Sequence, residues 1–593
     1  MKILKLSKLR SILFTFILVL NLIACQATTT AFTAGTYQAT VQAHNGDLSV
    51  EVVVDEETIQ SVVILDHNES VGIADGAIER IPLMIVESQS LAVDTISGAT
   101  ITSNAIIAAV TEALKQAGGD IAKLSIKNPI ETQKGETEVH TADVIIIGGG
   151  GAGLAAAVSA HQNGASVIVL EKMSRLGGNT ILAGGAFNAV DPVRQKAQGI
   201  EDSTDKHFQQ TMEGGDNKGN PVLVRILVDN AYDAIVWLEE LGMKFNDEVF
   251  TVLGGMWPRA HKPSTPLGTG FISTYENYIA NNEGITVLLN TTALELIVEE
   301  GRVVGVKAED LDSDVILNAN NGVIMATGGF SSNSAMLEKY NEVWPSLANA
   351  KTTNHPGATG DGLVMAEAIG ASLIGLSDIQ LLPMGDPITG SLRGNIEQGV
   401  ENRIFVNKEG NRFVDEGARR DVMTRALMEQ TDSWLWIVLD AKNYPTKDTK
   451  NNFNETIDDL ITQGRAFKGD TLEELAEQIG VDAENLKKAV EEFNQAVASG
   501  KPDAFGRTLF GAPIDTPPYY AAARIPTVHH TMGGIEINEF TQVLNTKGEI
   551  IPGLFAAGEV TGGIHGSNRL GGNALADIAV FGRIAGENAA LNR

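Results

Sequence analysis

Cysteine is nearly absent from the 593-residue chain, which contains one, Cys25. A single cysteine excludes a disulfide within the chain, an iron–sulfur cluster bound by several cysteines, and c-type haem, which needs two cysteines followed by histidine. Any redox centre that the chain itself binds should therefore be organic, and no metal site is predicted.

Positive charge is also scarce. The chain has 44 lysines and arginines against 74 aspartates and glutamates, a formal net charge of -30. A protein this acidic does not bind nucleic acid non-specifically and gains nothing from anionic lipid headgroups. Long low-complexity runs are missing as well, so the 62 glycines, which gather in short clusters, are typical of cofactor-binding loops.

The first residues have the layout of an export signal. Four basic residues between Lys2 and Arg10 precede an apolar run from Ile12 to Ala24, as in a secretory signal peptide. The run ends in Leu-Ile-Ala-Cys25, which resembles the bacterial lipobox, in which the cysteine receives a lipid. We expect a signal peptide at 1–24, a lipid on Cys25, a tether at 25–34, and an extracytoplasmic protein anchored to the cell membrane. The alternative is an uncleaved membrane helix, but the run is shorter than the roughly 20 residues that spanning needs.

A small α+β domain is predicted at 35–119, because 593 residues are too many for one hydrophobic core. Alternating or β-branched runs predict three strands, and two longer segments predict helices. The strands are expected at 37–43, 48–54 and 59–65, the helices at 74–88 and 103–116, and a linker at 120–140.

Between the two predicted helices the chain reads Asp94-Thr-Ile-Ser-Gly-Ala-Thr100. This stretch resembles the flavinylation motif of the FMN-binding domain in sodium-pumping quinone reductases and related extracytoplasmic electron carriers. The resemblance implies a phosphoester between Thr100 and FMN, made by a flavin transferase. A helix starting near Thr102 would point its N–H groups at the phosphate. The same turn is also typical of an ordinary helix N-cap.

A second domain has the signature of a dinucleotide site. A buried strand from Asp143 to Ile147 leads into Gly148-x-Gly150-x-x-Gly153 and a helix, and the next strand ends at Glu171. The first glycine permits the turn, the second lets a pyrophosphate approach, and the third allows the helix to pack on the strand. Glycine-rich turns at 177–180, 183–185 and 558–559 come from distant parts of the chain. Distant segments closing on one dinucleotide are typical of enzymes that retain FAD rather than release NAD.

Four further segments carry a family resemblance: Thr353–Gly362, Asn411–Asp421, His529–Gly534 and Gly558–Leu575. With them the chain resembles, from about Ala142 to its end, the soluble fumarate reductases, flavocytochrome c and urocanate reductases. The resemblance implies an α/β fold: a Rossmann-like FAD-binding domain (141–375 and 532–593) with an inserted α+β capping domain (376–531). It also implies non-covalent FAD contacts from Gly148, Gly150, Ala152, Gly153, Glu171, Lys172, Gly178, Asn179, Thr180, Gly184, Gly185, Asp361, Glu559, Ala574 and Leu575.

The reaction that the resemblance implies is reduction of a C=C bond conjugated to a carboxylate. Hydride from FAD reaches the β-carbon, and the site must bind the carboxylate and protonate the α-carbon. Arg420 matches the family's proton donor, and His530, Arg569 and Gly572 match its substrate-binding segments. The alternative for Arg420 is an exposed ion pair with Asp421 or Glu416. The neighbouring histidines His529 and His565 are predicted to be structural.

The capping segment departs from the fumarate reductases. Their Gln-Ala-His-Pro corresponds to Gln380-Leu-Leu382-Pro here, and leucine cannot donate a hydrogen bond to a second carboxylate, whose burial unpaired is costly. Glu397 is a candidate proton relay or a partner for a cationic or N–H-bearing substrate tail, unless Glu397 and Glu401 belong to a solvated loop. Urocanate or another acrylate-type monocarboxylate is therefore ranked above fumarate.

Other readings stay open. The chain could be a fumarate reductase proper in anaerobic respiration, or an electron carrier that reduces no substrate. A steroid or amino-acid dehydrogenase on the same scaffold would not need an FMN donor. A quinol-linked fumarate reductase subunit would need a flavin-linking histidine, which is absent between Gly177 and Gly185. The expected electron donor is a quinone-linked membrane flavoprotein.

Overall fold

A computed structural model describes residues 31–43, 46–67, 69, 74–96, 99–126, 135–310 and 313–593. The predicted signal peptide and Cys25 lie outside these residues, as do Ser97, Gly98 and the side chain of Thr100 in the flavinylation motif. No helix within the described ranges is long and apolar enough to cross a membrane.

The chain divides into two compact units between Thr132 and Gln133, inside the linker predicted at 120–140. A short helix, α4 (Ile121–Leu124), begins this predicted linker. Its last carbonyl, on Leu124, accepts hydrogen bonds from Leu91 N at 2.7 Å and Ser90 Oγ at 2.9 Å. The start of the predicted linker is therefore part of the first unit, and the second unit's first strand starts at Glu138.

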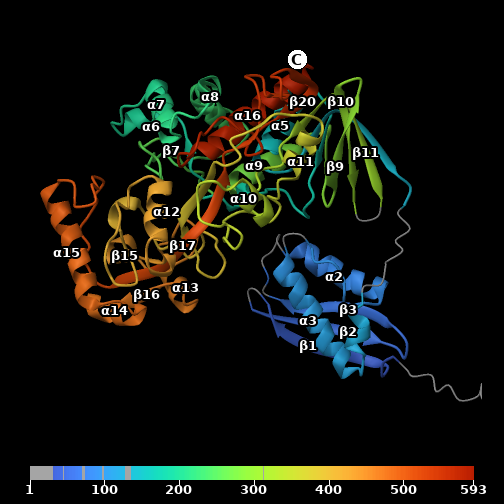
Figure 1. Cartoon of the computed structure of the whole chain (residues 1–593), viewed down its shortest axis with the longest axis horizontal. Coiled ribbons are helices and arrows are strands. Elements are labelled where there is room, and N and C mark those ends of the chain that lie inside the picture. The colour runs from blue at the N-terminus through green and yellow to red at the C-terminus, as the bar shows by residue number, and fades with distance from the viewer. Residues whose placement is uncertain are drawn as a thin grey trace, which may run out of the picture. The chain divides into compact units, whose positions relative to one another are not determined.

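The first unit is the small α+β domain (Figure 1, blue). Its strands form an antiparallel sheet in the order β1-β2-β3. Every second residue of β2 is buried, from Leu48 to Val54, because one face of the strand packs on the helices. The elements are β1 (Gly35–Gln42), β2 (Asp47–Val54), β3 (Ile59–His67), α2 (Asp75–Ser88) and α3 (Thr100–Gln116).

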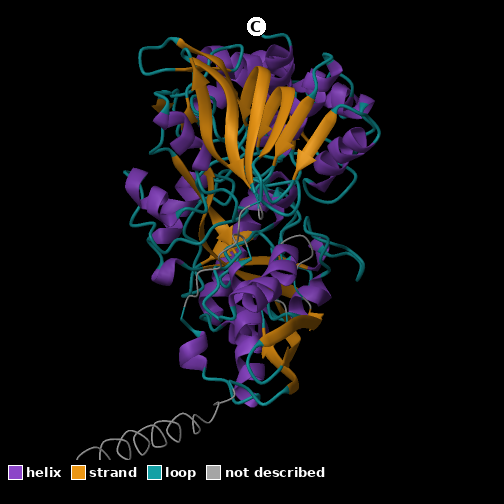
Figure 2. Ribbon diagram, turned by 90° about the vertical axis from the view of Figure 1, so that its right-hand side faces the viewer, coloured by secondary structure: helices purple, strands orange, loops and turns teal. Residues whose placement is uncertain are grey.

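The second unit is built on a mixed sheet of eight described strands in the order β19-β20-β11-β4-β5-β8, with β10 on β11 and β9 on β10. The central pairs, from β20 to β8, are parallel. Figure 2 shows these strands side by side with helices packed around them. The strands are β4 (Glu138–Ile147), β5 (Val167–Leu170), β8 (Ile285–Leu288), β9 (Thr292–Glu299), β10 (Arg302–Glu309), β11 (Asp314–Met325), β19 (Gln542–Leu544) and β20 (Ile550–Ala556).

The first long helix of this unit, α5, and the last one, α16, lie against each other although they are far apart in the sequence. Small residues make the contact possible: a Cβ on Gly582 or Gly586 of α16 would lie 2.7 or 2.3 Å from backbone oxygens of α5. The helices are α5 (Gly151–Gln162), α6 (Arg194–Ala197), α7 (Thr204–Gly214), α8 (Pro221–Glu240), α9 (Thr269–Ala280), α10 (Ser334–Tyr340), α11 (Asp361–Ala368) and α16 (Asn573–Ala590), with a 3-10 turn η1 (Thr180–Leu182). Two short strand pairs join loops: β6 (Phe187–Asn188) with β7 (Ala260–His261), and β12 (Leu373–Ile374) with β18 (Gly534–Ile535).

A second sheet lies in the segment predicted as the capping domain. Its order is β13-β17-β15-β14, with β16 on β17, and two apolar clusters cover it. Its strands are β13 (Ile379–Gly385), β14 (Ile404–Val406), β15 (Leu435–Asp440), β16 (Phe467–Gly469) and β17 (Tyr519–Thr531). Its helices are α12 (Arg420–Met428), α13 (Ile457–Thr462), α14 (Leu472–Ile479) and α15 (Ala483–Ser499), with 3-10 turns η2 (Val400–Asn402), η3 (Thr431–Ser433) and η4 (Ala441–Asn443). The FAD-type sheet thus receives strands from both sides of this insertion, as the Rossmann-like prediction requires.

Candidate active site

A cavity of about 1390 Å³, counting space open to solvent, lies at the carboxyl ends of the parallel strands. Ligands of open α/β sheets bind at this edge. Twelve of the predicted FAD contacts line it: Gly148, Gly150, Ala152, Glu171, Lys172, Gly178, Asn179, Thr180, Asp361, Glu559, Ala574 and Leu575. Gly153, Gly184 and Gly185 do not line it.

The three glycines of the first turn differ in what surrounds them. Gly148 has a φ of +110°, and a Cβ there would lie 2.4 Å from Ala326 O. A Cβ on Gly153 would lie 1.9 Å from Gly148 O, so this position serves helix packing rather than the ligand. A Cβ on Gly150 would meet no protein atom within 4 Å. Gly150 is also the N-cap of α5 and lines the cavity, so it leaves room for a phosphate at a helix N-terminus.

Glu171 directly follows β5 and is buried. Its carboxylate accepts hydrogen bonds from Gly149 N and Met173 N, both at 2.9 Å, and burial raises its pKa. Next to it, Lys172 Nζ donates to Asp361 Oδ2 at 2.5 Å and Thr359 Oγ1 at 2.6 Å. A carboxylate fixed in this way at the end of the second strand suits a ribose hydroxyl, so the residues present fit FAD.

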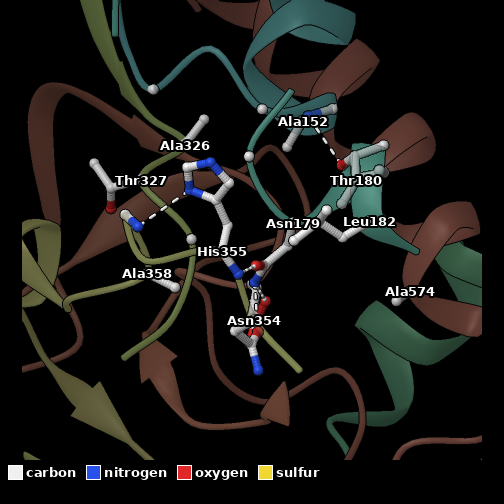
Figure 3. A pocket seen from close by; sticks show the side chains of 18 of the residues that line it. Ala152, Asn179, Thr180, Leu182, Ala326, Thr327, Asn354, His355, Ala358 and Ala574 are labelled. Carbon is white, nitrogen blue, oxygen red and sulfur yellow. Dashed lines mark hydrogen bonds between the residues drawn. The ribbon is translucent and has the colours of Figure 1, made fainter. Parts of the chain in front are cut away.

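One wall of this cavity contains two residues, Asn354 and His355, that were not predicted as contacts. Figure 3 shows them next to Asn179, which was predicted. Asn179 donates to Asn354 Oδ1 and accepts from His355 N, both at 2.6 Å. Burial lowers the pKa of His355 to about 4, so its ring is neutral near pH 7. Asn354 and His355 lie in the segment Thr353–Gly362, whose resemblance to the family was the sequence feature that could have identified them as contacts.

Two arginines meet at one end of the site. Arg569 lines the cavity and is buried, and Arg420, the first residue of α12, is buried beside it. Arg420 Nη1 and Arg569 Nη2 donate to the same atom, Gln380 Oε1, at 3.1 and 3.3 Å. The Nε atoms of both arginines find no hydrogen-bond partner in the part of the chain that the structure describes. A buried pair of guanidiniums with spare donors is suited to bind an anion.

The alternative reading of Arg420 as an exposed ion pair is wrong. Asp421 pairs with Arg419 at 3.0 Å. Glu416 is fully buried and pairs with Arg412 and Arg507 at 2.7 Å. Arg420 instead donates to Leu253 O at 2.9 Å and to Gln380 Oε1 at 3.1 Å.

Burial dominates the electrostatics of this end. It lowers the pKa of Arg420 well below its ordinary value, with the charge of Arg569 acting in the same direction and Glu397 opposing it. Burial lowers the pKa of Arg569 to about 10, while Glu559 and Asp577 hold it up. Arg569 therefore stays charged at neutral pH, and the guanidinium protons of Arg420 are more acidic than those of an exposed arginine.

Both predicted histidine positions line the cavity, but in different settings. His530 is buried, with Nδ1 3.5 Å from Glu559 Oε1. His529, predicted to be structural, also lines the cavity, and its Nδ1 lies 2.8 Å from Thr353 Oγ1. Burial lowers the pKa of both rings well below the ordinary value. His530 Nε2 is buried and finds no hydrogen-bond partner in the described part of the chain.

Three remaining residues take supporting positions. Gly572 does not line the cavity; it is the N-cap of α16, and a Cβ there would lie 2.3 Å from Asn188 Oδ1. His565 is buried and pairs with Asp577 at 3.0 Å. Glu397 is buried and forms an ion pair with the fully buried Arg403, so the solvated-loop reading of Glu397 is wrong.

Comparison with known proteins extends these observations. The model of the FAD binding domain family matches residues 143–575, and that of the FMN-binding domain family matches 44–115. The chain is 39% identical to NADH:acrylate oxidoreductase of Vibrio harveyi, over 94% of this chain and 61% of the relative. It is 38% identical to urocanate reductase of Eggerthella lenta, over 94% and 92%.

Among solved structures, the open conformation of a flavocytochrome c3 fumarate reductase matches with a TM-score of 0.63 and 37% identity, over 76% of this chain and 78% of that one. The chain spans 61% and 59% of the length of two curated relatives, the acrylate oxidoreductase and NADH:fumarate oxidoreductase of Klebsiella pneumoniae. With a matched FAD-binding domain, a matched FMN-binding domain and a relative aligned along almost its whole length, the chain belongs to the family of soluble FAD-dependent fumarate and urocanate reductases.

Proposed function

We propose that this protein reduces the C=C bond of a small unsaturated carboxylate to the saturated acid. The observation that carries the proposal is the convergence of Arg420 and Arg569 on Gln380 at one end of the FAD-type cavity. The names of the relatives, which act on acrylate, fumarate and urocanate, support the same reaction class. FAD, when bound, supplies the hydride that reaches the β-carbon.

Arg569 and His530 are the proposed carboxylate-binding residues. Arg569 lines the cavity and remains a cation at neutral pH. His530 lines the same cavity, and its buried Nε2, which has no partner among the described residues, is proposed to contact the carboxylate. His529, whose Nδ1 contacts Thr353 Oγ1, is proposed to complete this wall. Negative charge that develops on the carboxylate as hydride arrives would be stabilised by these fixed donors, which need no reorganisation.

Arg420 is the proposed proton donor to the α-carbon. Its burial beside a second guanidinium makes its protons more acidic, which an arginine needs in order to act as an acid. Glu397, which is ion-paired with Arg403 and whose charge opposes the lowered pKa of Arg420, is proposed to return the proton. The substrate then gains one hydride and one proton and loses only its double bond.

Electrons are proposed to enter through FMN bound to the first unit, as an FMN-binding domain in the same chain supports. The finer proposals rest on sequence patterns: a phosphoester from Thr100 to FMN made by a flavin transferase, a lipid on Cys25, an extracytoplasmic location at the cell membrane, and a quinone-linked membrane donor. Two anchoring acyl chains would make the membrane association stable.

The reaction is tested by supplying electrons to the purified holoprotein from reduced methyl viologen. We expect steady oxidation of the dye by at least one of acrylate, cinnamate, urocanate and fumarate, with the saturated acid as product. If none of the four oxidises the dye while both flavins are present and reducible, the reductase proposal fails and an electron-carrier function takes its place.

A further inference from the structure

The Glu397 carboxylate is paired with one buried arginine and lies within the electrostatic influence of two others. Its Oε2 contacts Arg403 Nε in an ion pair. Burial lowers the pKa of Arg420 and that of Arg524, and in both cases Glu397 is among the charges that oppose the shift. Arg403 is thus the ion-pair partner of Glu397, while Arg420 and Arg524 interact with its charge without forming an ion pair, so the negative charge is compensated before any substrate arrives.

Arg403 is held so that it cannot leave this pairing for solvent. It has no exposed surface, it lies between η2 and β14, and its guanidinium stacks on the Phe405 ring at 4.2 Å. Its carbonyl accepts a hydrogen bond from Arg507 Nη1 at 2.8 Å. Removing a partner from a buried ion pair leaves an uncompensated charge, so Glu397 and Arg403 act as a unit.

Leucine side chains lie near the pair formed by Arg420 and Arg569. Leu382, two residues after Gln380 on β13, packs in an apolar cluster that includes Leu253, Leu392 and Met423. Leu392 lines the cavity, and Leu253 is the residue whose carbonyl accepts from Arg420. Part of the surface adjoining the arginines is therefore apolar, and none of these leucine side chains can hydrogen-bond to a charged substituent.

We propose that Arg403 is a specificity-determining positioning residue: by saturating Glu397, it restricts the site to monocarboxylates whose β-substituent is uncharged and apolar. The proposal rests on the reductase function above and names its substrate class. A second carboxylate would be buried against leucine, and a cationic substituent would approach an acid that is already paired. Both groups would lose their hydration without gaining a partner.

Three nearly isosteric substrates test the class: crotonate, with a methyl group on the β-carbon, fumarate, with a carboxylate, and γ-aminocrotonate, with an aminomethyl cation. With viologen-driven holoprotein, kcat/KM for crotonate should exceed each of the other two on the order of 100-fold, the usual scale for burying an unpaired charge or polar group. A preference for fumarate or γ-aminocrotonate would overturn the inference and leave the reductase function intact. Failure of all three, together with acrylate, would instead count against the function itself.

The role of Arg403 is tested with Arg403→Met. The variant leaves Glu397 unpaired, so kcat/KM for γ-aminocrotonate should rise on the order of tenfold relative to crotonate. The kcat/KM for fumarate relative to crotonate should not rise. Lys408→Met is the matched control, because it removes one positive charge at an exposed ion pair with Asp432, and its ratios should equal those of the wild type. An unchanged γ-aminocrotonate ratio in a flavin-replete Arg403→Met protein would contradict the role. If that variant does not hold its flavins, Arg403→Gln takes its place with the same expected rise, because it also removes the positive charge; an unchanged kcat/KM for γ-aminocrotonate relative to crotonate there would contradict the role.

Discussion

Arg420 and Arg569 share one acceptor, the side-chain oxygen of Gln380. The other end of the same amide donates to Arg569 O at 2.8 Å and Asn568 Oδ1 at 2.9 Å, which fixes its orientation. One neutral oxygen compensates two like charges only weakly, so the arrangement holds the guanidiniums together and leaves them in need of an anion. Gln380 comes from β13 of the inserted segment, Arg420 from α12, and Arg569 from the residues just before α16.

Replacing Gln380 with leucine should weaken catalysis by removing the acceptor that holds Arg420 and Arg569 together. Both guanidiniums lose their shared acceptor, and kcat/KM for acrylate should fall about 10- to 100-fold, equivalent to about 1.4–2.7 kcal/mol. Gln380→Glu should instead raise KM, because a fixed carboxylate would compete with that of the substrate. Gln495→Leu, at an exposed position on α15, is the control. Equal activity in Gln380→Leu and the control would count against a functional role for this contact.

Arg420→Met should abolish turnover without loss of FAD. A missing proton donor typically costs about 100- to 10,000-fold in rate. The FAD content should not change, since Arg420 does not line the cofactor cavity. The neighbouring Arg419→Met is a close control, because Arg419 is paired with Asp216 and Asp421 rather than with Gln380, and it should stay within a few-fold of the wild type. Retention of most activity in Arg420→Met would remove Arg420 from the mechanism.

The sequence predicted those parts of the molecule that local patterns determine. Gly148, Gly150 and Gly153 have the surroundings expected for turn, ligand approach and helix packing, since a strand and helix that follow each other in the chain fix them. The surroundings of Arg420 could not be predicted, because Leu253 and Gln380 are far from it in sequence. Glu397 pairs with Arg403, which is near it in sequence, but a charged pair of this kind does not reveal from the sequence that both of its members are buried. His529, predicted to be structural, lines the cavity together with His530, and the sequence does not show that two consecutive residues both reach it.

Stability should fall with acid because of His207. This side chain is fully buried, its Nε2 lies 3.1 Å from Asn573 Oδ1, and burial lowers its pKa to about 3. The unfolded chain has the higher pKa, about 6.5, so it takes up the proton first. The contribution is therefore complete above about pH 6.5 and is lost as the pH falls towards 3, by up to about 1.4 kcal/mol per pH unit.

The variant His207→Gln should flatten this dependence when the free energy of unfolding in urea is measured between pH 7 and pH 5. His140→Gln, at a partly exposed histidine, should keep the wild-type slope. A slope in His207→Gln as steep as that of the wild type would show that other groups cause the acid sensitivity.

Thr100 should carry the FMN. Intact-mass measurement of the flavinylated protein should show one added FMN, which Thr100→Ala loses and Thr100→Ser retains, since the phosphoester needs a hydroxyl group. Thr95→Ala, an exposed threonine of the same motif, should remain flavinylated. Covalent FMN in Thr100→Ala would move the attachment to another residue, while its absence from the wild type expressed with a flavin transferase would mean that FMN is held without a bond.

The most direct test of the account is a single anaerobic turnover. The holoprotein is reduced with a known number of electrons, mixed with acrylate, and followed by flavin absorbance and by analysis of the acid product. We predict that the flavins reoxidise with one propionate formed for every two electrons, and that Arg420→Met stays reduced on the same timescale. The account would be contradicted if the wild-type flavins stayed reduced with acrylate, cinnamate, urocanate and fumarate alike, or if they reoxidised without forming the corresponding saturated acid.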